Sequence, residues 1–115
     1  MDTGPVAYDD DLADRVRAQV GGETGLSEQR MFGGLAFLIN GNMAVAVSGQ
    51  GGLLLRVDPA ETDALICAQE ATRFQMRGRE MDGWLRITAN SDTPDDVLNR
   101  WIARGVAYAR SLPPK

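Results

Sequence analysis

The sequence predicts an α+β domain, a two-layer sandwich in which an antiparallel sheet of about five strands carries helices on one face. Residues 30–57 contain no acidic residue, are mostly apolar and are interrupted by Gly-Gly, Asn-Gly and a glycine-rich run. Such a composition is typical of consecutive strands joined by tight turns. Helical patterns precede and follow this stretch, so we expect helices to cover the sheet. The predicted order of elements is α-β-β-β(-β)-α-β-β-α.

The length of 115 residues indicates a single domain, and the 43% hydrophobic content is sufficient for its core. We expect residues 1–7 to form a flexible N-terminus and residues 8–115 to form the domain. A first helix is predicted from about Asp10 to Val20, because apolar residues recur there at every fourth position and two glycines follow.

Four strands are predicted next, at residues 27–32, 35–39, 43–47 and 53–57. Asn40-Gly41 is a strong hairpin signal between the second and third of them. The bulky residues of these two strands lie on a common face if Ile39 pairs with Met43, whereas a two-residue turn would place them on opposite faces. We therefore expect a three-residue loop, Asn40-Gly41-Asn42.

A short helix and two further strands are predicted in the second half of the chain. Asp58-Pro59 supplies an N-cap residue and a first-turn proline, and the helix is expected from about Pro59 to Ala68, with Ala64 among its inward-facing residues. The two extended segments are at residues 73–76 and 83–88. Alternation in the second of them directs its core side chains inward, namely Leu85 and Ile87.

The last helix has the strongest pattern of any element. Thr93 is the expected N-cap, Pro94 the first-turn proline, and two aspartates follow where the helix dipole favours negative charge. A wide apolar stripe runs along the helix, which is predicted to end near Ser111. Its members are Val97, Leu98, Trp101, Ile102, Val106 and Ala109.

The net charge of −4 disfavours direct binding to nucleic acid, because that binding depends largely on neutralising phosphates. Cys67 is the only cysteine, which excludes an intrachain disulfide and fits a reducing compartment. No apolar run approaches the ~20 residues that span a bilayer. The acidic N-terminus has no signal-peptide pattern. We therefore expect a cytoplasmic protein with no membrane contact.

The sequence offers no catalytic, cofactor-binding or metal-binding residues, and we expect no cofactor and no enzymatic activity. There is no histidine, which removes the commonest general base and metal ligand. Cys67 is expected to be an inert, partly buried thiol. Helix capping explains Asp9-Asp10-Asp11 better than an ion site does, since three consecutive carboxylates cannot share one face. Turn geometry explains Gly33-Gly34 and the glycines of residues 49–52 better than a phosphate site does.

One set of residues has the composition of an interaction surface. Arginine beside an exposed aromatic ring suits carboxylates, phosphates or a protein partner. The predicted surface lies on the polar face of the sheet and consists of Arg56, Arg77, Arg79, Trp84 and Arg86. A solvated outer face with scattered arginines is the simpler explanation. An alternative use of the same face is the binding of a small molecule or anion, or an unrecognised enzymatic reaction.

Several motifs resemble the TfoX N-terminal domain family, which is named for a bacterial regulator of natural competence also called Sxy. They occur in the family's order over nearly the whole chain: RMFGGLAF at 30–37, INGNM at 39–43, GLLLRV at 52–57, GREMDGW at 78–84 and YARSLPPK at 108–115. The resemblance implies a two-layer fold of the kind grouped with type III secretion chaperones. It supplies no catalytic residues.

The resemblance also implies a regulatory role. The namesake proteins carry a second, helical C-terminal domain, and we expect the present chain to be a stand-alone first domain, so their competence activation does not transfer directly. We expect a non-enzymatic regulatory or protein-interaction domain, with a link to transcription implied by the family. A protein partner is expected, and the sequence leaves a homodimer open.

Overall fold

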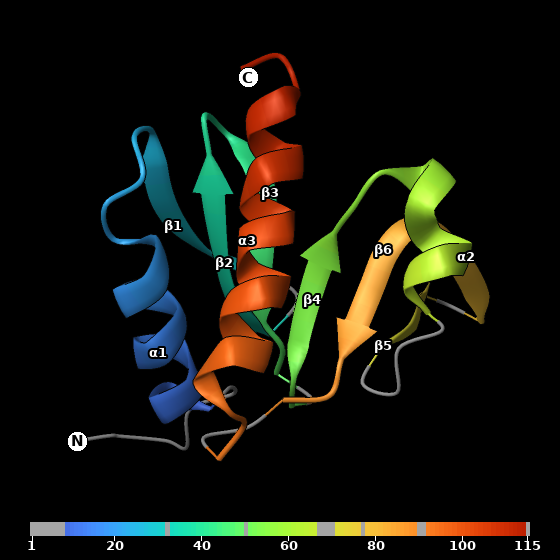
Figure 1. Cartoon of the computed structure of the whole chain (residues 1–115), viewed down its shortest axis with the longest axis horizontal. Helices are drawn as coiled ribbons and strands as arrows, with labels where there is room; N and C mark the ends of the chain where they lie inside the picture. The colour runs from blue at the N-terminus through green and yellow to red at the C-terminus, as the bar shows by residue number, and fades with distance from the viewer. Residues whose placement is uncertain are drawn as a thin grey trace.

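A six-stranded antiparallel sheet and three helices form two layers (Figure 1). The computed structural model describes residues 9–31, 33–49, 51–66, 71–76, 78–89 and 92–114. Within them the elements are α1 (Asp10–Val20), β1 (Leu26–Met31), β2 (Gly34–Ile39), β3 (Asn42–Val47), β4 (Leu53–Arg56), a 3₁₀ turn (Pro59–Glu61), α2 (Thr62–Leu65), β5 (Ala71–Met76), β6 (Arg79–Ile87) and α3 (Asp95–Ser111).

The sheet has the strand order β1-β2-β3-β4-β6-β5, and α1 and α3 lie side by side against one of its faces (Figure 1). We call this the helix face and the opposite one the outer face. The α+β sandwich predicted from the sequence is confirmed. Its sheet has six strands instead of about five, because all six of the segments predicted to be extended pair in it.

The β2–β3 hairpin differs from the prediction. Asn40 and Gly41 form a two-residue turn with φ angles of 53° and 86°, and Ile39 pairs with Asn42. The expected pairing of Ile39 with Met43 is therefore wrong. A β-bulge, instead of a longer loop, brings the bulky residues of the two strands to one face. Leu38 pairs with Met43 and Phe37 pairs with Val45, which leaves the residue between Met43 and Val45 unpaired.

That unpaired residue, Ala44, decides which side chains reach the core. Because it shifts the register by one position, Val45 and Val47 return to the helix face, opposite Phe37 and Leu35, as the sequence pattern requires. Met43, on the other side of the bulge, turns to the outer face. The alternation of large and small residues in the sequence does not predict such a bulge.

Two clusters of buried apolar side chains result. The main core lies between the helix face and the helices, and includes Leu12, Phe37, Ile39, Leu53, Leu55, Leu85, Ile87, Leu98 and Ile102. A smaller one, which we call the outer cluster, lies on the outer face. It comprises Ala36, Leu38, Met43, Ala46 and Leu54, with Phe74 and Trp84 packed against them. Leu85 and Ile87 face the main core and Trp84 faces away, as predicted.

α3 approaches the sheet most closely at Gly105. A Cβ atom added there would lie 2.5 Å from the carbonyl oxygen of Ala44 and 2.8 Å from Cδ1 of Leu55. Real Cβ atoms do not come so near a backbone oxygen, so only glycine permits this distance between helix and sheet. The contact lies directly over the β-bulge, and it sets the position of α3 above β3 and β4.

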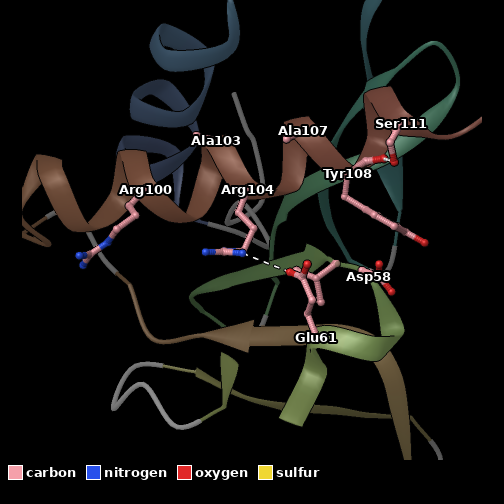
Figure 2. Close-up of a pocket in the computed structure, with 9 residues that line it drawn as sticks. Asp58, Glu61, Arg100, Ala103, Arg104, Ala107, Tyr108 and Ser111 are labelled. Carbon is pink, nitrogen blue, oxygen red and sulfur yellow. Dashed lines mark hydrogen bonds and ion pairs between the residues drawn. The ribbon is translucent and has the colours of Figure 1, made fainter. Parts of the chain in front are cut away.

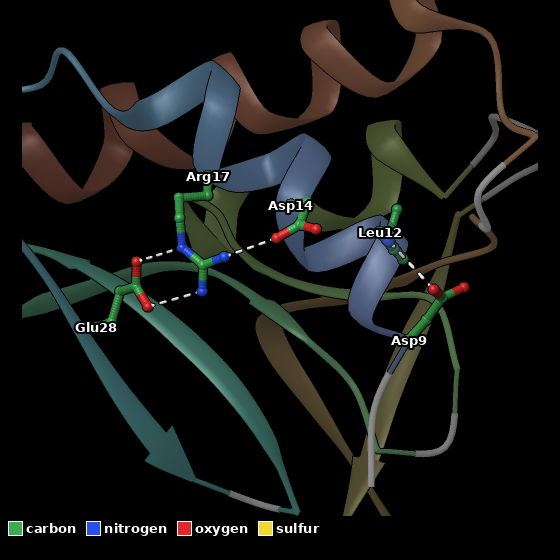
Figure 3. Close-up of polar contacts among 5 residues, drawn as sticks. All are labelled: Asp9, Leu12, Asp14, Arg17 and Glu28. Atoms are coloured by element: carbon green, nitrogen blue, oxygen red, sulfur yellow. Dashed lines mark hydrogen bonds and ion pairs between the residues drawn. The ribbon is translucent and has the colours of Figure 1, made fainter. Parts of the chain in front are cut away.

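α1 has the predicted bounds and the predicted cap. The Asp9 carboxylate accepts a hydrogen bond of 3.1 Å from the backbone nitrogen of Leu12, which confirms a capping role for the first of the three aspartates (Figure 3). Arg17 fixes the helix to β1, since its Nε and Nη2 donate to the two carboxylate oxygens of Glu28 at 2.8 and 3.0 Å. These bonds, and the charge of the guanidinium, lower the pKa of Glu28 below its ordinary value of 4.5.

The other helices begin near their predicted positions. α3 starts at Asp95, with Pro94 at the N-cap position instead of Thr93, and it ends at Ser111 as expected. Asp58 caps the 3₁₀ turn by accepting a hydrogen bond of 2.9 Å from the backbone nitrogen of Ala60.

The short helical segment after Asp58 is only partly as predicted. It is a 3₁₀ turn followed by the single turn of α2, and residues 67–70, which include the predicted end at Ala68, lie outside the described residues. Ala64 is exposed, contrary to the prediction, and Thr62 is the buried residue of this turn. Across the described part of the chain, no helix combines the length and the apolar character needed to cross a bilayer.

Replacement of Gly105 by alanine should lower the free energy of unfolding. The added methyl group would meet the Ala44 carbonyl, and overpacking of this kind costs about 1–3 kcal/mol. At an unobstructed helix position the same change raises stability by roughly 1 kcal/mol. Urea unfolding followed by circular dichroism measures the difference. Gly22→Ala, in the turn after α1, is the control for an added methyl group without steric contact, because nothing lies within 4 Å of the added atom. A Gly105→Ala protein more stable than wild type would contradict the packing described.

Glu28→Gln should destabilise the protein at neutral pH and have less effect in acid. A carboxyl group whose pKa is lowered by folding adds stability above its unfolded pKa and loses it as pH falls through the folded pKa. The pair is partly exposed, so the expected loss at pH 7 is about 1 kcal/mol or less. Unfolding free energies at pH 7 and below pH ~4 test this. A double-mutant cycle with Arg17→Met that gives no coupling at pH 7 would refute the pairing.

Candidate functional site

Four of the five residues in the predicted interaction surface can be placed. Arg56 at the end of β4 is directly opposite Trp84 on β6, and the preceding pair in the register joins Leu54 to Arg86. Arg79 begins β6 and is exposed at the far end of the β5–β6 hairpin, opposite Met76. The fifth, Arg77, lies outside the described residues. Arg56, Trp84 and Arg86 therefore form a contiguous group on the outer face, and Arg79 stands apart from them.

Arg56 lies between two aromatic rings from opposite layers of the molecule. Its guanidinium carbon is 5.6 Å from the centre of the Trp84 ring and 5.8 Å from that of Tyr108, which projects from α3. These are distances at which a cation is attracted to the face of a ring. β3 and β4 stop pairing at Val45 and Leu55, so Arg56 has no partner strand on that side. Within the described residues it forms no ion pair.

Arg86 is bound to the turn between β3 and β4. One of its terminal nitrogens donates to the carbonyl oxygen of Gly51 at 2.9 Å, and the other is 3.5 Å from the hydroxyl oxygen of Ser48. Both partners are neutral, so the positive charge stays uncompensated by any described carboxylate. Arg86 therefore has a structural role in the turn and still presents a cation on the outer face.

The backbone beneath Arg56 and Trp84 is held by a buried threonine. Thr62 in α2 is 1% exposed, and its hydroxyl accepts a hydrogen bond of 2.8 Å from the nitrogen of Gly83 and donates one of 2.9 Å to the carbonyl of Pro59. The carbonyl of Gly83 in turn accepts a bond of 2.9 Å from Val57. Gly83 precedes Trp84 and Val57 follows Arg56. These hydrogen bonds therefore fix the backbone from which the side chains of Arg56 and Trp84 project.

A groove of about 490 Å³ lies on the helix side, between α3 and the segment that leads into α2 (Figure 2). Arg104 crosses it to Glu61, with 3.2 Å between Nη1 and Oε1. Tyr108 lines one end, where Ser111 donates a hydrogen bond of 2.6 Å to its carbonyl oxygen, and Arg100 lies at the other end (Figure 2). The charged groups at the centre of the groove thus neutralise one another, and the groove has no preference for a ligand of one sign.

The described residues contain little that could perform covalent or metal-dependent chemistry. Among them there is no group of three or more Cys, Asp or Glu side chains that could hold a metal ion. Cys67 is outside the described residues. A hollow of about 410 Å³ lies beside Arg86 and is lined by Thr72, Arg73, Phe74, Gln75 and Arg86, but not by Arg56 or Trp84. Of the predicted interaction surface, this hollow therefore includes Arg86 alone among the described residues.

Two residues of the surface were not singled out from the sequence. Tyr108 comes from a helix far along the chain, and its position over Arg56 follows only from the docking of α3. Phe74 packs against the outer cluster, as Trp84 does, although a register shift after Arg73 pairs it with Met81 and not with Trp84. Phe74 could have been found from the sequence, because it lies between two polar residues in the predicted strand at 73–76. An aromatic ring in that position either packs on one face of the sheet or is exposed.

Thr62→Val should destabilise the protein although valine has nearly the same shape as threonine. The change leaves the backbone nitrogen of Gly83 buried without an acceptor, which costs about 1–3 kcal/mol. Thermal unfolding measures the loss, and a shift in tryptophan fluorescence, to which Trp84 contributes, is expected with it. Thr72→Val on β5 is the control, because Thr72 is exposed. Equal stabilities for Thr62→Val and wild type would remove the anchoring role.

The sequence model of the TfoX N-terminal domain family matches residues 18–109, from the last turn of α1 through all six strands to the last turns of α3. No curated protein and no solved structure matches the chain. The matched range covers most of the 115 residues. The chain belongs to the TfoX N-terminal domain family.

Proposed function

We propose that this chain is a non-enzymatic protein-interaction domain with a regulatory role, and that Arg56 is the centre of its contact surface. The observation that carries the proposal is the environment of Arg56, which two rings hold in place and no carboxylate neutralises. A guanidinium held in this way loses little conformational freedom when it binds, and its planar edge can take a carboxylate with two hydrogen bonds. Arginine and aromatic residues also dominate the energetics of protein interfaces.

The contrast with other arginines of the chain supports this choice. Arg15, Arg17, Arg73, Arg104 and Arg110 are each paired with a carboxylate, namely that of Asp95, Glu28, Asp63, Glu61 and Glu23 respectively. Those ion pairs join α1, α2 and α3 to their surroundings and so serve the fold. Arg56 is not part of that system, which leaves its charge for a molecule from outside.

The family supports the regulatory part of the proposal. The motifs shared with the TfoX N-terminal domain, and the match over residues 18–109, favour a bacterial cytoplasmic regulator that acts by contacting another protein, with a link to transcription. The absence of histidine and of a carboxylate cluster among the described residues gives no support to an enzymatic alternative.

A second candidate function is the binding of a small anion at Arg86. The hollow beside it supplies a concave surface, and its guanidinium is uncompensated by a described carboxylate. A panel of carboxylates and phosphates that raised the melting temperature of wild type, but not of Arg86→Gln, would favour this function over a protein contact.

The test of the main proposal is affinity capture of the tagged chain from its own host, with and without nuclease, followed by quantitative mass spectrometry. We expect a protein that is recovered in stoichiometric amount after nuclease treatment and whose recovery falls at least tenfold with Arg56→Glu. Arg100→Glu is the matched control, because Arg100 is exposed on α3 and has no described ion pair.

Circular dichroism must first show that both variants are folded. Full recovery of the same partner by folded Arg56→Glu protein would exclude Arg56 as the contact centre. A partner released by nuclease would show that nucleic acid, and not this surface, makes the connection.

A further inference from the structure

We propose that the outer face binds an acidic segment of a partner protein, in which carboxylates flank an aromatic or aliphatic side chain. This inference rests on the proposed function and names the chemical class of the partner. It follows from three properties of the outer face: the sign of its charges, the accessible rings between them, and the spacing of both along the strands.

The charges of the described residues are divided between the two sides of the sheet. Arg56 and Arg86 lie on the outer face, and alternation from Phe74 through Met76 places Arg79 on the same side. No described side chain on this face is a carboxylate, although the chain as a whole has a net charge of −4. The carboxylates of Glu28, Glu61, Asp63 and Asp95 are on the helix side, where each meets an arginine. Among the described side chains, the outer face therefore presents positive charge without a carboxylate to balance it.

Apolar contact on this face is available at two rings. The members of the outer cluster are largely buried, with Leu38, the most accessible of them, 9% exposed. Phe74 and Trp84, which pack against that cluster, are only half-buried. A partner side chain would thus lie on these rings, with a packed apolar layer beneath them. Aromatic residues with an arginine at their edge are the usual anchors of a protein interface.

The strand register fixes the spacing between the cations and the tryptophan. Trp84 is directly opposite Arg56, about 5 Å away across the strands, and Arg86 is two residues further along β6, roughly 7 Å from Trp84. Both arginines are therefore neighbours of the same ring, Arg56 across the strands and Arg86 along β6. In an extended segment, alternate side chains are also roughly 7 Å apart on one side. A segment with an apolar residue over Trp84 and acidic residues within a few positions on either side matches this arrangement.

Other occupants suit the face less well. A nucleic acid needs many phosphate contacts for useful affinity, and a domain of net charge −4 with three arginines on this face repels the rest of a long polyanion. A second copy placed face to face would bring the same cations against each other. A short acidic segment avoids both costs, because its few charges all reach arginine.

The experiment is a selection of random twelve-residue peptides displayed on phage against the purified, immobilised chain. We expect the enriched sequences to contain aspartate or glutamate on both sides of an aromatic or aliphatic residue. A synthetic copy of the most enriched peptide, labelled for fluorescence polarisation, should bind at least tenfold more weakly to Arg56→Glu than to wild type. Its affinity should also fall as salt is raised. Arg100→Glu should bind as wild type does.

Several outcomes would overturn the inference: no enrichment, enriched peptides without acidic residues, or equal affinity for wild type and folded Arg56→Glu. Tighter, Arg56-dependent binding of a labelled single-stranded oligonucleotide would assign the face to nucleic acid. Dimers seen by light scattering for wild type and lost in Arg56→Glu would assign it to a second copy. If a cellular partner depends on Arg56 but the selected peptides are not acidic, the proposed function stands and this inference fails.

Discussion

The contact between Gly105 of α3 and the carbonyl of Ala44 is the constraint on which the rest of the architecture depends. Ala44 is the unpaired residue of the β-bulge, so the position at which the sheet departs from regular pairing is also the position at which the helix comes closest. The bulge keeps Val45 and Val47 in the main core, and the missing side chain at residue 105 lets α3 pack directly over them. With α3 fixed there, Tyr108 lies one turn further along and reaches Arg56.

Electrostatics then separates the two sides of the sheet. On the helix side, arginine pairs with carboxylate between several elements, as between Arg17 and Glu28 or between Arg104 and Glu61. Each such exposed pair contributes little to stability on its own, and its effect is mainly to fix geometry. On the outer face, aromatic rings and neutral oxygens take the place of carboxylates as the partners of Arg56 and Arg86. A ring orients a cation without neutralising it.

Local signals in the sequence were sufficient for much of this fold. The bounds of α1, the cap at Asp9 and the end of α3 at Ser111 follow from periodicity, capping chemistry and dipole-matched charge, which act within one or two turns. The outward direction of Trp84 follows from strand alternation in the same way. Features that need two distant segments were not predictable: the bulge at Ala44 makes sense only beside Gly105.

The residues of the candidate surface also differ in whether local sequence patterns could predict them. Arg56, Trp84 and Arg86 could be grouped from their alternation in two strands, because neighbouring strands bring such positions together. Tyr108 could not, since its ring meets Arg56 only after α3 has docked. The burial of Thr62 also escaped the pattern, because α2 is one turn long and has no period from which an inward face can be read.

The three residue pairs that join β3 to β4 leave an opening at the end of β4, and Arg56 occupies it with one ring from each layer. In a two-layer protein a continuous sheet normally separates the side chains of its two faces. Here the side chain of Arg56 contacts a ring from each side. Trp84 belongs to the outer face and Tyr108 to the helix layer, so the position of this one guanidinium depends on side chains from both layers.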